Sequence, residues 1–88
     1  MIKIVHAQVI VDHIVRLAFS DGSSGDLDLT ELVDRDTEMV RPLKDPVFFA
    51  DCFLELGALC WRNGFELSAP SLHRKLAQRG TLRHADAA

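Results

Sequence analysis

Along the first thirty residues, apolar and polar side chains alternate with the period of two that is typical of strands with one buried face. The alternation covers residues 3–11, 14–20 and 25–29. Asp12-His13 and Asp21-Gly22 separate these runs, and Asp-Gly favours a tight hairpin turn because it accepts positive backbone φ angles. The pattern therefore predicts an antiparallel three-stranded meander. Its inward-facing side chains are expected to be Val5, Ala7, Val9, Val11, Val15, Leu17, Phe19, Leu27 and Leu29.

Three helical segments are expected in the rest of the chain. A single turn at residues 30–33 follows Asp28, which is placed to cap it. A two-turn helix at residues 45–51 begins with Asp-Pro, because Asp accepts hydrogen bonds from free amides and Pro is tolerated in a first helical turn. The clearest helix spans residues 69–79, after the capping residue Ser68. The side chains expected to face the core from the last two helices are Val47, Phe48, Phe49, Leu72 and Leu76.

Short strands are expected between these two helices. Residues 52–61 are mostly apolar and indicate two strands folded about Gly57. Asn63-Gly64 is the strongest two-residue signal for a further hairpin turn, and a brief strand at residues 65–67 follows it. The fold class predicted is therefore α+β. It consists of a mostly antiparallel sheet, made of the N-terminal three-stranded meander and short C-terminal strands, with a short middle helix and a C-terminal helix.

Length and composition fit one small domain. A chain of 88 residues buries only roughly 60–65% of its unfolded surface, which leaves a thin margin of stability unless a partner adds to it. Its hydrophobic content of 48% and charged content of 26% are typical of an ordered globular protein. We expect a single domain over residues 1–80 and a frayed C-terminal tail over residues 81–88.

Acidic and basic side chains are unevenly distributed. Residues 1–70 carry six basic and twelve acidic side chains, whereas residues 71–88 carry four basic and one acidic. The overall net charge of −3 argues against nucleic-acid binding through a broad basic surface. Two local candidate surfaces remain. The candidate partner-binding residues are Asp34, Asp36 and Glu38, and the candidate nucleic-acid contacts are Arg74, Lys75, Arg79 and Arg83.

Neither a metal site nor a catalytic group is indicated. The four histidines and two cysteines contain no close ligand pair of the kind that structural zinc sites use. Asp34, Asp36 and Glu38 alternate as calcium ligands do, but the central Gly of a calcium loop is missing. The sequence has no Gly-rich phosphate loop and no Ser-His-Asp order typical of a hydrolase. We therefore expect no cofactor, no metal and no enzymatic activity.

Cys52 and Cys60 each lie about four residues from the expected turn, so they are predicted to be near neighbours across that hairpin. They form a redox disulfide or two adjacent reduced thiols, and the second alternative is favoured because cytoplasmic disulfides are rare. No apolar run reaches the roughly 18–20 residues of a membrane span. The first residues also lack the order of a secretion signal, so a cytoplasmic location without membrane contact is expected.

The motifs named above occur in a distinctive order. They are Phe19-Ser20-Asp21-Gly22, Asp28-Leu29, Leu43-Lys44-Asp45-Pro46-x-x-Phe49, Trp61-x-Asn63-Gly64-x-Glu66-Leu67 and Pro70-x-Leu72. In this order the chain resembles the small bacterial family catalogued as "domain of unknown function 2442", over about residues 5–76. The family usually has Asp where this chain has Glu66. The motifs are also explained by the fold itself, because they supply turns, a helix start and core aromatics.

What the resemblance implies about function is limited to an analogy. The family has no established activity, so no catalytic residue can be carried over. Its members often lie beside another small uncharacterised gene in what look like toxin–antitoxin modules, which implies a partner-binding role. Three hypotheses stay open. The favoured one is a protein-interaction module, antitoxin-like, that binds another small protein or its own copy; the others are a small-ligand-binding or enzymatic domain and an accessory nucleic-acid contact.

Overall fold

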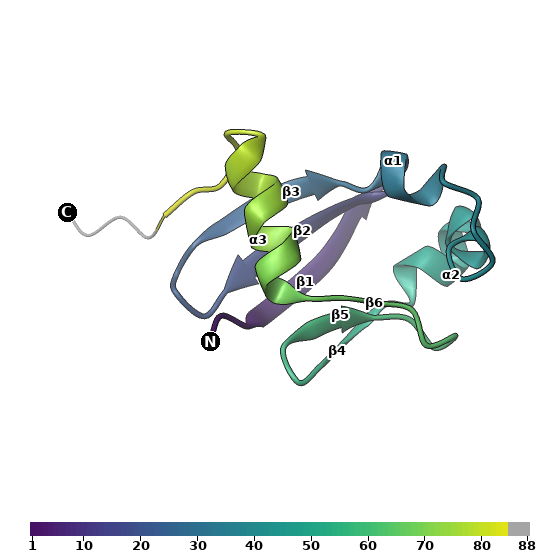
Figure 1. Cartoon of the computed structure of the whole chain (residues 1–88), viewed down its shortest axis with the longest axis horizontal. Helices are drawn as coiled ribbons and strands as arrows, with labels where there is room; N and C mark the ends of the chain where they lie inside the picture. The colour runs from purple at the N-terminus through teal and green to yellow at the C-terminus, as the bar shows by residue number, and fades with distance from the viewer. Residues whose placement is uncertain (85–88) are drawn as a thin grey trace.

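Two three-stranded antiparallel sheets form the β part of the structure, a computed structural model in which residues 1–84 are described. The first sheet has the order β1-β2-β3 and contains β1 (Ile4–Val11), β2 (Ile14–Phe19) and β3 (Ser24–Asp28). The second has the order β4-β5-β6 and contains β4 (Phe53–Glu55), β5 (Ala58–Cys60) and β6 (Glu66–Leu67). Figure 1 shows the two sheets beside each other, with the start of β1 next to the smaller one. The predicted meander and short C-terminal strands are confirmed.

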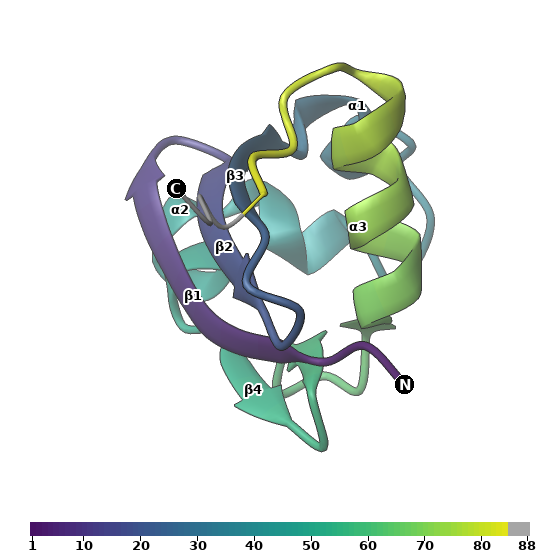
Figure 2. The same cartoon turned by 90° about the vertical axis from the view of Figure 1, so that its left-hand side faces the viewer.

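The helices connect and cover these sheets. They are α1 (Thr30–Val33), the 3₁₀ helix η1 (Arg41–Lys44), α2 (Pro46–Ala50) and α3 (Ala69–Gln78). Asp45 and Ser68 cap α2 and α3 as predicted, accepting hydrogen bonds from the amides of Val47 and Ser71. Asp28 accepts from the Thr30 amide at 2.9 Å, although the capping position of α1 belongs to the next residue. Figure 2 shows α3 on one side of the first sheet. The α+β class predicted from the sequence is confirmed.

One hydrophobic core joins both sheets and α3. Phe19, Phe49, Trp61 and Leu72 all belong to it and are at most 2% exposed, which confirms the prediction that they share a core. The Trp61 indole N–H donates to the Phe49 carbonyl at 2.9 Å, so the ring is fixed by a hydrogen bond as well as by packing. At the other end of the second sheet, the Ile4 amide donates to a carbonyl in the β4–β5 turn.

β1 departs from the predicted alternation because its register against β2 shifts twice, next to Val5 and next to Ile10. A β-bulge inserts one residue and moves the following side chains to the opposite face of the sheet. Ile4 is consequently buried, whereas Val5 and Val11 are 60% and 53% exposed, and the prediction that these two valines face inward is wrong. The side chains that keep the predicted inward phase are Ala7 and Val9.

Val47 is a second departure from the predicted core. It is 78% exposed, whereas Phe49 is fully buried and Phe48 is half-buried. Successive helical residues are about 100° apart around the axis, so three in a row cannot all face the sheet. The prediction that Val47 packs on the sheet is therefore wrong.

The segment after α3 is attached to the first sheet. Gly80, with a φ of 71°, ends the helix in the left-handed conformation that glycine adopts readily. Arg83 then forms an isolated antiparallel bridge with Ser24, in which the amide of each residue donates to the carbonyl of the other. Arg83, which lies in the segment 81–88 that is expected to fray, thus has a backbone partner on β3, and residues 85–88 lie outside the described part of the chain.

Candidate partner-binding surfaces

The acidic segment between α1 and η1 contains all three candidate partner-binding residues, and all three are exposed. Asp36 is engaged locally, because its carboxylate accepts from Lys44 Nζ at 2.8 Å and from Arg41 Nε at 3.2 Å. These hydrogen bonds, the one from Lys44 first, lower the pKa of Asp36 below its usual value. Asp34 and Glu38 form no ion pair within residues 1–84. The segment therefore offers two free carboxylates rather than three.

The four candidate nucleic-acid contacts do not share one face. Arg74 and Arg79 are five residues apart on or at the end of α3, which places them about 140° apart around its axis. Arg79 donates to the Asp28 carbonyl at 2.9 Å and lies 3.8 Å from a Glu31 carboxylate oxygen. Arg83 is beyond the helix, paired with β3. The structure thus separates Arg74, Arg79 and Arg83. The fourth residue, Lys75, is half-buried on α3, one helical turn before Arg79.

The outer face of the first sheet carries an ion pair over a shallow hollow of about 610 Å³. Arg16 donates two hydrogen bonds to Asp26, at 2.9 and 3.1 Å. This contact raises the pKa of Arg16 and lowers the pKa of Asp26. Arg16 is thus paired with Asp26, and Arg83 is a second arginine that lines this hollow.

The outer edge of β1 is a further candidate partner-binding surface. β1 pairs with β2 alone, and beyond Ile4 none of its outward backbone groups has a backbone partner within the described residues. Its residues include no Asp, Glu, Lys, Arg or Pro. Three of its apolar side chains are exposed, Val5, Ile10 and Val11. Natural edge strands are commonly guarded by charges or proline, so an uncharged edge with exposed apolar side chains is suited to pairing with another strand.

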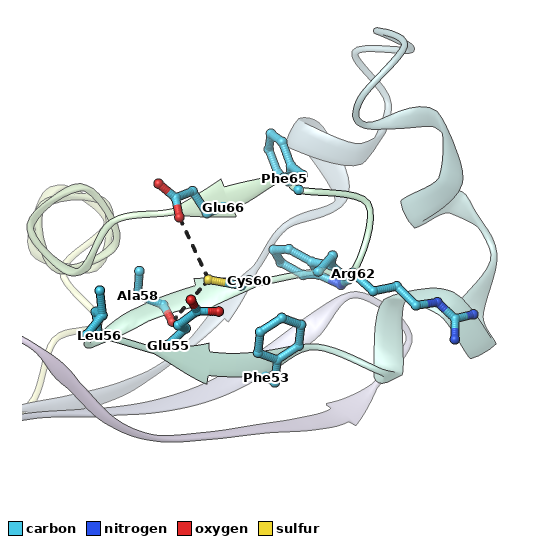
Figure 3. A pocket seen from close by; sticks show the side chains of 10 residues that line it. Phe53, Glu55, Leu56, Ala58, Cys60, Arg62, Phe65 and Glu66 are labelled. Atoms are coloured by element: carbon cyan, nitrogen blue, oxygen red, sulfur yellow. Dashed lines mark hydrogen bonds between the residues drawn. The ribbon is translucent and has the colours of Figure 1, made fainter.

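A groove on the outer face of the second sheet is the other candidate, and it was not predicted from the sequence. Cross-strand pairing places Phe53, Cys60 and Glu66 in one row and Glu55 and Ala58 in the next. These side chains surround a hollow of about 430 Å³. Figure 3 shows the Glu55 and Glu66 carboxylates on either side of the Cys60 sulfur. The groove therefore has an apolar floor and an acidic rim.

Cys60 lies at the bottom of this groove. Its Sγ is 3.9 Å from Glu66 Oε2 and 3.7 Å from the Ala58 carbonyl. Burial, followed by the negative charges of Glu66 and Glu55, raises the pKa of the Cys60 thiol above its usual value. The groove consequently disfavours a thiolate, which is the reactive form of a cysteine.

The β4–β5 hairpin turns at Leu56 and Gly57, in agreement with the predicted turn at Gly57, and its register determines how the two cysteines lie. Leu56 and Gly57 form a two-residue turn with φ of 52° and 80°, so Cys60 pairs with Phe53 rather than with Cys52. Because neighbouring strand residues face opposite sides, Cys52 is directed toward the core and Cys60 toward the groove. Both thiols are free, and they are not direct cross-strand neighbours.

Two further features bear on the class of site. Within residues 1–84, no three His, Cys, Asp or Glu side chains are grouped so that they could hold a metal ion. The same residues contain no helix that is long and apolar enough to cross a membrane.

The class of protein is thus a small α+β domain with two antiparallel sheets, an open strand edge and an acid-rimmed groove. Residues 4–77 match the model of a family described as "Protein of unknown function (DUF2442)". The match covers most of the chain, so the chain belongs to this family and the resemblance in its motifs is confirmed. No curated protein and no solved structure matches the chain.

Proposed function

We propose that this chain is a protein-interaction module that binds its partner by adding a strand of that partner to the open edge of β1. The observation that carries the proposal is that, within residues 1–84, the outer edge of β1 has no backbone partner beyond Ile4, together with the exposed apolar side chains of this strand. Strand addition of this kind supplies affinity through main-chain hydrogen bonds and specificity through alternate side chains. A domain of this size also has a thin margin of stability, to which a partner would add.

The partner is proposed to be a second small protein or a second copy of this chain. In the two-gene arrangement that the family resemblance implies, it would be the product of the neighbouring gene, and this chain would be the antitoxin-like half. Asp34 and Glu38, which have no ion-pair partner among the described residues, would steer a basic partner and raise its association rate more than its affinity. Reversing both charges should then slow association at low salt and leave dissociation nearly unchanged.

The test compares two surface substitutions of the same chemistry. The double variant Val5→Lys with Val11→Lys places charges on β1, where lysine guards natural edge strands. The matched control is Val47→Lys, which changes an exposed valine on α2. All three positions are exposed, so far-UV circular dichroism should show folded protein in each case.

The tagged protein is then recovered from its native host, with mass spectrometry and absorbance at 260 nm measured on the same eluate. A stoichiometric protein that the β1 variant loses and the Val47→Lys control keeps would support the proposal. Slower amide exchange at residues 5–11 in the purified complex would place the partner on this edge. A nucleotide signal without protein, or a partner retained by the β1 variant, would contradict it.

A further inference from the structure

We propose that the acid-rimmed groove on the outer face of β4, β5 and β6 is a second binding site, which takes a short peptide segment containing an apolar side chain flanked by lysine or arginine. The site is separate from the β1 edge and goes beyond strand addition. Its rim consists of Glu55 and Glu66, and its floor and wall consist of Ala58, Cys60 and Phe53.

The groove has exposed apolar side chains beside it. Phe53 is 42% exposed and Leu56 is 94% exposed, although both lie in a hairpin whose other face packs into the core. Leu54 and Leu59 pair on the core side, so the alternation of the strands directs Phe53 outward. A partly covered aromatic side chain beside a hollow is the usual anchor point of a peptide interface.

The rim of the groove carries two carboxylates. Neither Glu55 nor Glu66 forms an ion pair within the described residues. Arg62 is the one basic residue among the ten described residues that line the groove, and it is committed elsewhere. Its guanidinium lies 3.3 Å from Asp51 and 5.3 Å from the centre of the Phe48 ring. Figure 3 shows this side chain pointing away from the two glutamates. The rim is left with two negative charges, which complement a cationic segment.

The shape of the groove favours a peptide over a small amine. Pockets for small molecules usually enclose most of the ligand surface. This groove is open and crosses all three strands, from Phe53 on β4 to Glu66 on β6. A segment lying across the strands can reach both glutamates while one apolar side chain contacts Phe53, whereas a small amine can reach only part of this surface.

The experiment uses ¹⁵N-labelled full-length chain and the synthetic peptide acetyl-Lys-Leu-Arg-Leu-Lys-amide, with acetyl-Glu-Leu-Glu-Leu-Glu-amide as the reversed-charge probe. Amide chemical shifts report where each peptide binds. We expect the basic peptide to shift signals of residues 53–66 with micromolar to millimolar affinity, and the acidic peptide to shift none of them. Raising the salt concentration should weaken the binding, because the rim charges are screened.

The variants separate the rim from charge in general. Glu55→Gln combined with Glu66→Gln should weaken peptide binding about tenfold, since an exposed ion pair contributes up to about fivefold. The matched control, Glu31→Gln combined with Glu38→Gln, removes two exposed carboxylates outside the groove and should leave the affinity unchanged. Phe53→Ala should weaken binding by about fivefold or more, because it removes the aromatic anchor.

Several outcomes overturn the inference. One is that millimolar basic peptide shifts no signals of residues 53–66, and another is that the Glu55→Gln and Glu66→Gln double variant binds the peptide as tightly as the wild type. The third is that phenethylamine binds as tightly as the basic peptide, which would make the groove a small-molecule site. The β1 variant Val5→Lys with Val11→Lys keeps the two proposals distinguishable. It should still bind the basic peptide even if it loses the native partner.

Discussion

Replacing Trp61 tests the packing that holds both sheets together. The ring is 1% exposed, lies 5.5 Å from the Phe49 ring and 5.8 Å from the Phe65 ring, and donates its indole N–H to the Phe49 carbonyl. Trp61→Phe removes that donor, which costs about 1–3 kcal/mol for a buried carbonyl, and leaves a small cavity besides. We therefore expect a loss of about 2–3 kcal/mol in unfolding free energy for Trp61→Phe, and about 3–5 kcal/mol for Trp61→Ala.

These losses are large for a chain of this size. At roughly 0.05–0.15 kcal/mol per residue, the total stability is about 4–13 kcal/mol, so Trp61→Ala removes about a quarter of it or more. Urea unfolding is followed by far-UV circular dichroism, because the substitution removes the chain's single tryptophan. With a urea slope of about 1–2 kcal/mol per molar, Trp61→Phe should lower the midpoint by roughly 1–3 M.

The control for this prediction is Phe53→Ala, which truncates an aromatic side chain of the same sheet on its exposed face. It should cost no more than about 1 kcal/mol, because most of the lost contact is with solvent. If Trp61→Phe is no more damaging than Phe53→Ala, the reasoning about the core is refuted. A fluorescence maximum typical of water-exposed indole in the folded wild type would refute it as well.

Three further predictions address the acidic residues, a tight turn and a thiol. Hydrogen bonds from Ser23 lower the pKa of Asp21, and hydrogen bonds from Thr30 lower the pKa of Asp28. The stability that these two carboxylates contribute is therefore fully present above the ordinary aspartate pKa and is lost as the pH falls below about 4. Urea midpoints at pH 7, 5 and 3 will check this. Gly57→Ala should destabilise the chain more than Gly80→Ala in urea unfolding. Both substitutions strain a residue with positive φ, by about 1–2 kcal/mol. Only Gly57→Ala also brings its new Cβ to 2.7 Å from a neighbouring side chain. Burial raises the pKa of Cys60, so its alkylation by iodoacetamide, followed by mass spectrometry, should be far slower in the folded chain than in urea; equal rates would contradict the buried position.

Most of the fold could be predicted because its signals are local. In β2 the apolar positions alternate without interruption, and glycine-containing pairs mark the turns at Gly22, Gly57 and Gly64, all of which have positive φ. The ends of α3 are equally local, with Ser68 before the helix and Gly80 after it. These elements are determined by residues a few positions apart, so periodicity and turn chemistry are sufficient to find them.

The errors arose where the structure depends on distant contacts. The bulges in β1 have no sequence signature, because an inserted valine or isoleucine in an apolar run does not interrupt the pattern. The same limitation applies to the groove: Phe53 is apolar and was not expected on a solvent-facing surface. One signal could have revealed it, because Phe53 and Glu55 share a strand face, and a glutamate on that face indicates exposure.

The candidate charges illustrate the same point. Asp36 belongs to the densest acidic stretch of the sequence, yet Lys44 and Arg41, brought near by η1, neutralise it. Arg79 belongs to a basic segment, yet it reaches back to the Asp28 carbonyl, fifty-one positions earlier in the chain. Counting charges along the sequence identifies where they are concentrated, but which of them remain available depends on tertiary contacts.

The bridge between Arg83 and Ser24 makes the two borders of the first sheet unequal. On the β3 border, Arg83 occupies the backbone of Ser24 at one end and the Arg79 side chain occupies the Asp28 carbonyl at the other. A sheet with two open borders can stack head to tail without limit, which is how filaments grow. Here the β1 border of one molecule would meet an already occupied β3 border on the next, so growth by strand pairing stops after one addition. If strands add at the open β1 border, this inequality favours closed pairs over fibres.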